Sequence, residues 1–176
     1  MSLSLLISKA VKQDAKQIAD LVNSAYRGES SRQGWTTEAD FLDGSRTDPE
    51  EIIQLISSKD SIILVCKAET ELVGSVYLQN QGAQVCLGML AVKPILQNQG
   101  IGKQLMAAAE LVSQQTWRTD KMVMEVIPYR HELIAYYERR GYKSSGVRKA
   151  FPVNPEFWMP MVKDLCLEIL EKKLYI

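Results

Sequence analysis

Two glycines in the segment QNQGIGK (residues 97–103) form the part of the sequence best suited to binding a ligand. The segment follows an apolar, strand-like run and precedes residues with the spacing of a helix. Glycine lets a ligand approach the main chain closely, and the first turn of a helix leaves its backbone N–H groups unpaired. A helix that opens at Gly100 or Gly102 therefore offers donors to an anion, usually a phosphate, and Lys103 adds positive charge at the rim.

Two common phosphate-binding motifs do not fit this segment. A Walker loop needs a glycine where Gln97 stands and a Ser or Thr where Gln104 follows Lys103. A dinucleotide-binding fingerprint needs a third glycine where the sequence has Leu105. An NTPase or nucleotide phosphotransferase and an NAD- or FAD-dependent enzyme are therefore disfavoured. A tight strand-to-helix turn without any ligand stays open on the glycines alone.

The wider segment LAVKPILQNQGIGKQLM (residues 90–106) closely resembles the acetyl-CoA signature of the GNAT family of N-acetyltransferases. That signature has an apolar-x-Val-x-Pro strand end followed by Gln/Arg-x-x-Gly-x-Gly/Ala. The matching residues are Val92, Pro94, Gln97, Gly100 and Gly102. Downstream, AYYERRGY (residues 135–142) resembles the family's second signature, a Tyr followed four residues later by Gly and an aromatic residue. With the N-terminal strand and helix, the resemblance extends over nearly the whole chain.

This resemblance implies a fold and an activity. The expected fold is α/β (α+β): a mixed, mostly antiparallel central sheet, splayed at the cofactor site and flanked by helices on both faces, in a single N-acetyltransferase domain over residues 1–176. The implied activity is transfer of an acetyl group from acetyl-CoA to a primary amine of a small molecule or peptide, by direct attack on the thioester. The alternative is a catalytically silent acyl-CoA-binding regulatory or sensor domain.

The resemblance also implies which residues hold coenzyme A. Its diphosphate would bind backbone N–H groups of the glycine segment, which Gln97 would shape, and its pantetheine arm would pair with the main chain of the preceding strand. Arg130 stands where many members have an Asn that contacts the pantetheine arm, and it would instead reach a coenzyme phosphate or an acidic substrate. The expected cofactor-binding residues are Leu90, Ala91, Val92, Gln97, Asn98, Gln99, Gly100, Ile101, Gly102, Lys103 and Arg130.

Two residues are expected to carry the proton transfers. Tyr137, at the family's motif position, would protonate the leaving thiolate, because an unperturbed tyrosine pKa of about 10 lies above that of a thiol, about 8.5. Packing of this phenol in the core is the alternative. Glu125, an acid within the apolar strand KMVMEVI, would accept the proton of the amine unless it faces solvent or pairs with an arginine. Other candidates for the base are His131, Glu29 and a chain of water molecules.

The polar loop YRGESSRQGWTTE (residues 26–38) would, by the same resemblance, lie over the acceptor groove. Its expected substrate contacts are Tyr26, Glu29 and Trp35. The carboxylates of Glu29 and Glu38 would suit a cationic amine. The alternative is a solvated connecting loop with Trp35 folded onto the core.

Periodic patterns predict the elements that position these residues. Strands are predicted over residues 5–9, 61–68, 72–79, 84–92, 121–127 and 143–147. Helices are predicted after Asp14, after Asp48, from Gly100 or Gly102, and over residues 131–140. Residues 165–169 alternate like a terminal edge strand, with a helix over residues 163–173 as the competing interpretation. A kink near Gly88 or Met89 would open the sheet beside the cofactor.

Composition sets the remaining limits. The 176 residues are 46% hydrophobic and 24% charged, as in an ordinary globular domain. Because 21 basic and 21 acidic residues cancel, a nucleic-acid partner is not expected. No apolar run approaches the roughly 20 residues of a membrane span, and MSLSLLISKA lacks the features of a signal peptide. With three scattered cysteines, these features predict a cytoplasmic monomer or homodimer without a membrane partner.

Overall fold

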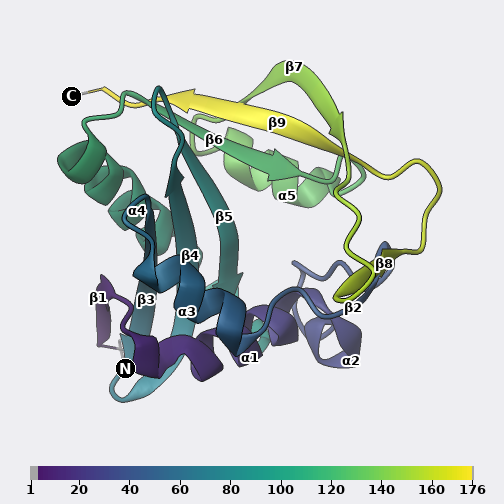
Figure 1. The fold of residues 1–176 in the computed structure, drawn as a ribbon, viewed down its shortest axis with the longest axis horizontal. Helices are drawn as coiled ribbons and strands as arrows, with labels where there is room; N and C mark the ends of the chain where they lie inside the picture. The colour runs from purple at the N-terminus through teal and green to yellow at the C-terminus, as the bar shows by residue number, and fades with distance from the viewer. Residues whose placement is uncertain (1–3, 176) are drawn as a thin grey trace.

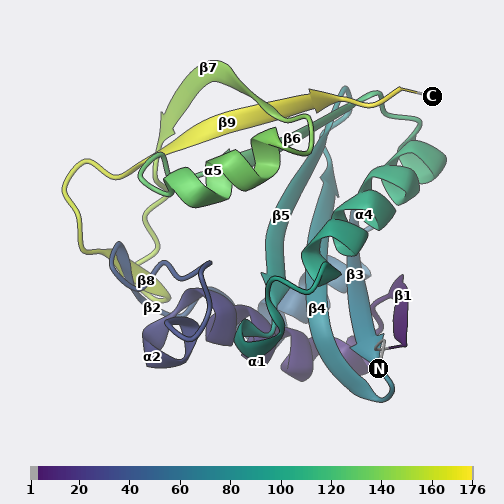
Figure 2. The same cartoon turned by 180° about the vertical axis from the view of Figure 1, so that it is seen from behind.

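The computed structural model describes residues 4–175, which form a mixed seven-stranded sheet, a separate two-stranded sheet and helices packed on the larger one (Figure 1, Figure 2). The strands are β1 (Leu5–Lys9), β2 (Leu42–Gly44), β3 (Ser61–Ala68), β4 (Glu71–Asn80), β5 (Val85–Val92), β6 (Lys121–Val126), β7 (Lys143–Ala150), β8 (Trp158–Pro160) and β9 (Cys166–Lys173). The helices are α1 (Ala15–Tyr26), α2 (Gly28–Ser31), α3 (Pro49–Ser57), α4 (Ile101–Trp117) and α5 (His131–Glu138), with short 3-10 turns η1 (Lys12–Asp14) and η2 (Pro94–Leu96). The predicted fold class is confirmed.

The large sheet has the strand order β1-β3-β4-β5-β6-β9-β7. Its neighbouring strands are antiparallel except β5 and β6, which are parallel and joined by α4, as a parallel crossover requires. The last segment of the chain is a strand, so the competing helix over residues 163–173 is wrong. This strand, β9, lies inside the sheet between β6 and β7, so the expectation of a terminal edge strand is also wrong.

A bulge in β5 lies beside the place where the large sheet opens between β5 and β6. The register between β4 and β5 shifts between Ser75 and Tyr77, because β5 has one residue more than β4 in this interval. Met89 lies in the extra segment with φ 45°, a left-handed conformation that non-glycine residues rarely adopt. β5 then pairs with β6 at only two positions, both near the start of β5, and the two strands diverge beyond them (Figure 1). The predicted kink near Gly88 or Met89 is confirmed.

Helices cover both faces of the large sheet. On one face lie α1 and α3, and the predicted apolar face of α1 is buried at Ile18, Leu21, Val22 and Ala25. On the other face lie α4 and α5, whose buried side chains share one hydrophobic cluster with β4, β5 and β6 (Figure 2). This second cluster is where Tyr137 of α5 is buried. The core therefore has two layers that are separated by the sheet.

The start of α3 follows local rules that the sequence shows. The carboxylate Oδ1 of Asp48 accepts a hydrogen bond from the backbone N–H of Glu51 at 2.7 Å, and Pro49 is the first helical residue. The predicted loop over residues 26–38 is less simple, because it starts at the last residue of α1 and includes the short helix α2. The strands β2 and β8 pair with each other in the separate two-stranded sheet and were not predicted. Within residues 4–175, none of the helices has the length and apolar character of a membrane span.

Candidate active site

The glycine segment forms a turn whose backbone N–H groups are free to bind a ligand. Gly100 precedes α4 with φ 83°, and Asn98 has φ 65°, so both lie in the left-handed region that such a turn requires. The N–H of Gln104 donates to the carbonyl of Gly100 at 3.1 Å. The N–H groups of the three residues between them therefore have no partner inside the helix.

Gln97 ties this turn to the loop that follows α2. Its side-chain Oε1 accepts a hydrogen bond from the backbone N–H of Trp35 at 2.9 Å. Its Nε2 donates to the hydroxyl of Thr36 at 2.9 Å and to the carbonyl of Val92 at 3.2 Å. One amide thus joins the end of β5 and the α2 loop beside the glycine turn.

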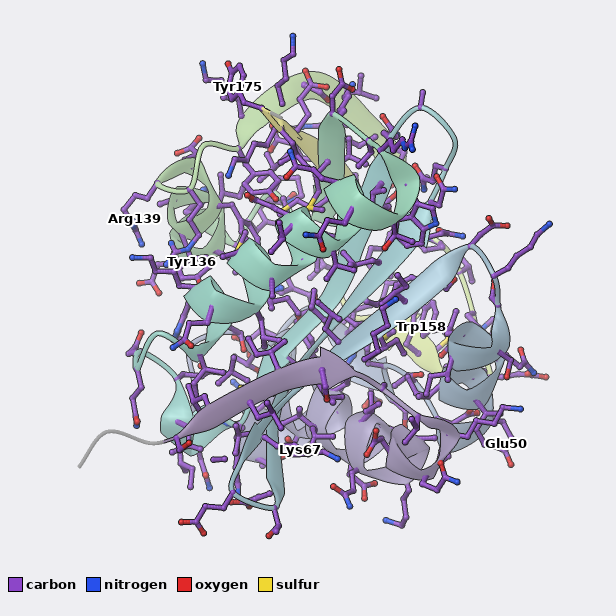
Figure 3. All side chains as sticks on the ribbon, turned by 90° about the vertical axis from the view of Figure 1, so that its left-hand side faces the viewer. Glu50, Lys67, Tyr136, Arg139, Trp158 and Tyr175 are labelled. Atoms are coloured by element: carbon purple, nitrogen blue, oxygen red, sulfur yellow. The ribbon has the colours of Figure 1, made fainter. Side chains whose placement is uncertain are left out.

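A first cavity of about 290 Å³, called here the loop cavity, opens at this turn. Its walls include Trp35, Gly100, Gly102, Tyr136, Arg139 and Arg140. Tyr136 and Arg139 lie together at the end of α5 (Figure 3). A Cβ added to Gly102 would lie 2.8 Å from the hydroxyl of Tyr136, so only glycine fits here without a shift.

Arg139 and Arg140 bring positive charge to the loop cavity, and the sequence analysis missed them. The guanidinium of Arg140 lies 3.4 Å from the ring centroid of Tyr136, and its Nη1 donates to the carbonyl of the same residue at 2.7 Å. Its Nε is buried without a hydrogen-bond partner among residues 4–175. The adjacent arginines inside the Tyr-to-Gly motif were the available signal.

A second cavity of about 430 Å³, called here the splay cavity, lies where β5 and β6 diverge. Its ionisable walls come from α1 and the following segment (Arg27, Glu38, Arg46), from β6 (Glu125), from the start of α5 (Arg130) and from β7 (Lys149). Trp158 of β8 also lines this cavity, which gives the unpredicted β2–β8 pair a role in the site.

The two cavities meet at Leu90, Leu133 and Tyr137, because these residues line both. Tyr137 is only 5% exposed. Burial raises the pKa of its phenol well above the ordinary value, and the neighbouring Tyr26 adds to this shift while Arg130 opposes it. The phenol is therefore protonated at neutral pH, and it lies at the point where the cavities join.

The comparison with known protein families agrees with this arrangement. Residues 59–144, which include the bulged strand, the glycine turn and α5, match the acetyltransferase (GNAT) domain. The chain contains a GNAT acetyltransferase domain. A search of curated proteins found no match to it.

Solved structures share the GNAT fold over almost the whole chain. The ribosomal-protein-S18-alanine N-acetyltransferase from Escherichia coli has a TM-score of 0.72 at 13% identity, covering 98% of this chain and 96% of that one. PaiA N-acetyltransferase from Thermoplasma acidophilum, in complex with coenzyme A, has a TM-score of 0.71 at 19% identity, covering 97% and 99%. The yncA structure from Salmonella typhimurium, with its cofactor acetyl-CoA, has a TM-score of 0.71 at 15% identity, covering 97% and 94%.

Within the GNAT domain, most of the expected cofactor residues gather at the loop cavity. Leu90, Val92, Gln97, Asn98, Gly100, Ile101 and Gly102 line it. Lys103 is exposed and does not line it. Ala91 and Gln99 also lie outside its walls, the former buried on the α1 side of the sheet and the latter exposed. The side chains of these last residues thus add nothing to the cavity, although their backbone belongs to the same strand and turn.

Arg130 lies in the splay cavity and away from the glycine turn. Its Nη1 donates to the carboxylate of Glu38 at 3.0 Å, and its Nη2 donates to the carbonyl of Thr36. Its side chain is 7% exposed and lies over the ring of Tyr26 at 5.8 Å. The structure therefore does not bring Arg130 to a coenzyme phosphate, because this ion pair holds it on the other side of the junction.

The three expected substrate contacts are separated in the structure. Tyr26 lines the splay cavity, and its hydroxyl donates to the carbonyl of Leu90 in the bulge. Burial raises the pKa of this phenol to about 12. Trp35 lines the loop cavity and packs against Tyr136 with ring centroids 5.3 Å apart. Glu29 is exposed, pairs with Arg32 at 3.2 Å and lines neither cavity.

The two acids of the splay cavity are both paired. Glu125 of β6 forms an ion pair with Lys149 of β7. Glu38 pairs with Arg27 at 3.2 Å in addition to Arg130. His131, the alternative base, is exposed at the first position of α5 and lines neither cavity.

Proposed function

We propose that this chain is an acetyl-CoA-dependent N-acetyltransferase, formed as one domain over residues 1–176, that acts on a primary amine of a small molecule or peptide. The observation that carries this proposal is the meeting of two cavities at Leu90, Leu133 and Tyr137. One cavity is suited to a phosphate-bearing cofactor, and the other is open to an acceptor. The coenzyme A and acetyl-CoA in two structures of the same fold support the assignment.

The loop cavity fits coenzyme A in its charge and its donors. The free N–H groups at the start of α4 would bind the diphosphate, and Arg139 and Arg140 would neutralise its charge. Beyond the bulge, residues 90–92 of β5 have no paired residue in β6, so the pantetheine amides would add to this edge of β5. The acetyl-CoA thioester supplies the activated acetyl group.

The chain's own residues would then handle the charge and the protons. The backbone N–H of Leu90 would donate to the thioester carbonyl, with the bulge held in place by the hydroxyl of Tyr26 on the carbonyl of Leu90. The amine nitrogen forms a bond to the acetyl carbon, the carbon–sulfur bond breaks, and the sulfur leaves as a thiolate. Tyr137 would donate its proton to that thiolate.

The amine must lose one proton before or during the attack. Glu125 is our proposed acceptor of this proton, directly or through water, because it is a carboxylate in the wall of the splay cavity. Among the described residues, Glu125 forms a single ion pair, with Lys149. Glu38 is a poorer candidate, since two arginines share its carboxylate.

The proposal is tested by measuring thiol release from acetyl-CoA with a broad panel of amines, and acetyl-CoA binding by calorimetry. Binding with turnover of at least one amine, and N-acetylated product by mass spectrometry, supports it. Tight binding without turnover across the panel would instead favour an acyl-CoA-binding sensor or regulatory domain. Absence of acetyl-CoA binding would overturn both.

A further inference from the structure

The walls of the splay cavity carry more positive than negative charge. Its basic side chains are Arg27, Arg46, Arg130 and Lys149, and its acidic ones are Glu38 and Glu125. Four basic groups against two acidic ones leave a formal excess of two positive charges. A cavity with this balance repels an acceptor that carries only ammonium groups. Of the two carboxylates expected to suit a cationic amine, Glu29 lies outside the cavity and Glu38 is shared by Arg27 and Arg130.

The internal ion pairs do not use up this positive charge. Glu38 is shared by Arg27 at 3.2 Å and Arg130 at 3.0 Å, and Glu125 is paired with Lys149. Among residues 4–175, no carboxylate lies within ion-pair distance of Arg46.

The arginine beside it is also incompletely satisfied. The side chain of Arg27 is 4% exposed, and its Nε has no hydrogen-bond partner in the described part of the chain. Burying a guanidinium whose one ion-pair contact, at 3.2 Å, is to a shared carboxylate costs free energy, and a further bound anion would reduce this cost. The repulsion of Arg46 and Arg130 contributes to lowering the pKa of Arg27, after burial itself, so these cations lie close enough to act together.

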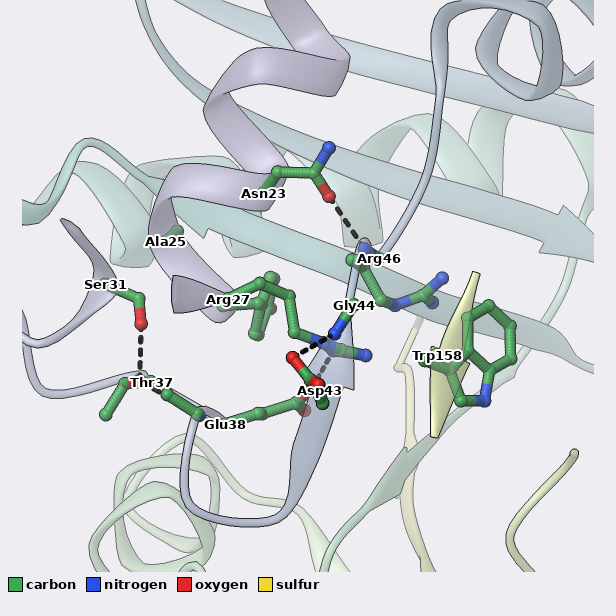
Figure 4. A network of polar contacts seen from close by, with 12 residues as sticks. Asn23, Ala25, Arg27, Ser31, Thr37, Glu38, Asp43, Gly44, Arg46 and Trp158 are labelled. Carbon is green, nitrogen blue, oxygen red and sulfur yellow. Dashed lines mark hydrogen bonds and ion pairs between the residues drawn. The ribbon is translucent and has the colours of Figure 1, made fainter. Parts of the chain in front are cut away.

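Arg46 is held at its place by the neighbouring helix. The side-chain Oδ1 of Asn23 on α1 accepts from the backbone N–H groups of Arg46 at 2.7 Å and Thr47 at 3.2 Å. The Nδ2 of Asn23 donates back to the carbonyl of Thr47 at 2.9 Å. The guanidinium extends over Trp158, 6.0 Å from its ring centroid (Figure 4). This arrangement fixes the backbone below Arg46 and leaves its polar head available to a ligand.

We propose that the acceptor is a small amine that also carries a carboxylate, and that Arg46 and Arg27 bind this carboxylate while the amine faces Leu90 and Tyr137. The guanidinium of an arginine binds a carboxylate through two parallel hydrogen bonds, whereas the ammonium group of a lysine does not. The cavity volume of about 430 Å³ suits a small molecule. This inference rests on the proposed function, because it names the substrate class for the same site.

The experiment compares acceptors that differ only in their charge. Thiol release from acetyl-CoA is measured with the common amino acids, with their carboxamides and with aminophosphonates. Calorimetry in the presence of coenzyme A measures the binding of the same compounds without turnover. The variants are Arg46→Met, Arg46→Lys and, as a matched control, Arg118→Met, which removes one exposed charge at the far end of α4.

We expect at least one amino acid to be used with a kcat/KM at least tenfold above that of its carboxamide. Arg46→Met should abolish this preference, mainly through the KM of the acceptor, without changing the KM of acetyl-CoA. Arg46→Lys should retain part of the preference for the amino acid. This variant keeps the test valid if Arg46→Met does not fold. Arg118→Met should behave like the parent protein.

Other outcomes separate this inference from the proposed function. Amino acids that bind in an Arg46-dependent manner, without turnover, would support the carboxylate site and overturn the transferase. Turnover in which amino acids and their carboxamides react equally well would overturn the inference and keep the transferase. Higher rates with aminophosphonates would assign the site to phosphate, and failure of every amino acid both to bind and to react would also overturn the inference.

Discussion

Replacing Tyr137 by Phe removes one oxygen from the point where the two cavities meet. Tyr137 is 5% exposed, and no hydrogen bond of its hydroxyl is found among residues 4–175. The substitution therefore leaves no buried partner unsatisfied, and we expect the free energy of unfolding to change by less than about 0.5 kcal/mol. The ring keeps its contacts in the core.

The effect on turnover should be much larger. A positioned general acid contributes about 10² to 10⁴ in rate. We expect the lower end of this range, about 100-fold or about 2.7 kcal/mol in barrier height, because a thiolate is a stable leaving group and the adjoining cavities admit water. The assay is steady-state thiol release at saturating acetyl-CoA. The KM of acetyl-CoA should stay within about threefold, since the lost hydroxyl acts on the leaving group.

Tyr142→Phe is the matched control, because it also removes a hydroxyl from a buried tyrosine but outside both cavities. The hydroxyl of Tyr142 donates to Glu110 at 3.1 Å. Its loss should lower the free energy of unfolding by about 1 to 2 kcal/mol and leave kcat unchanged. Equal kcat for Tyr137→Phe and the parent protein would refute the role of Tyr137 as the acid. A stability loss above 1 kcal/mol in Tyr137→Phe would show that its hydroxyl serves packing.

Three further changes have distinct expected outcomes. Gly102→Glu should weaken acetyl-CoA binding by more than 100-fold in calorimetry, because its side chain meets Tyr136 and adds negative charge to the loop cavity; unchanged affinity would remove the diphosphate from this turn. Trp35→Ala should raise the KM of acetyl-CoA more than the KM of the acceptor, since Trp35 lines the loop cavity. A larger increase in the KM of the acceptor would show that Trp35 contacts the acceptor instead. Burial opposes ionisation of Asp14, but the Val11 N–H and the Lys67 ammonium outweigh it and lower its pKa. The parent protein should thus be more stable than Asp14→Asn above pH 4, and this difference should disappear as the pH falls below the pKa of a free Asp carboxyl, about 3.9. A difference in the free energy of unfolding in urea that does not depend on pH would contradict this.

Much of the fold was predictable because local patterns and the global structure agree. The apolar positions of α1 recur with helical spacing and are all buried, and the Asp48-Pro49 start of α3 follows from capping rules. The position of Gly88 in a strand indicated the bulge that opens the sheet. The final segment was harder, since its residues are compatible with a strand and a helix, and only pairing with β6 and β7 on both sides selects the strand.

The candidate site divides in the same way. Residues 97–102 are contiguous, and the unpaired donors of a helix start follow from backbone geometry, so the sequence was sufficient to find them. The walls of the splay cavity come from α1, β6, α5, β7 and β8, which are distant in the chain. The charge balance between these walls, and hence the exclusion of Glu29 and the inclusion of Arg27 and Arg46, depends on their assembly.

The amino-acid sequence by itself determined the buried face of α1, the start of α3 and the glycine turn, because each depends on residues within a few helical turns of one another. The tertiary structure alone decided that Arg130 pairs with Glu38, that Trp35 faces the loop cavity and that β9 lies inside the sheet. The physical reason is that ion pairing and burial depend on distances in space, and those distances follow from strand order and from the divergence of β5 and β6.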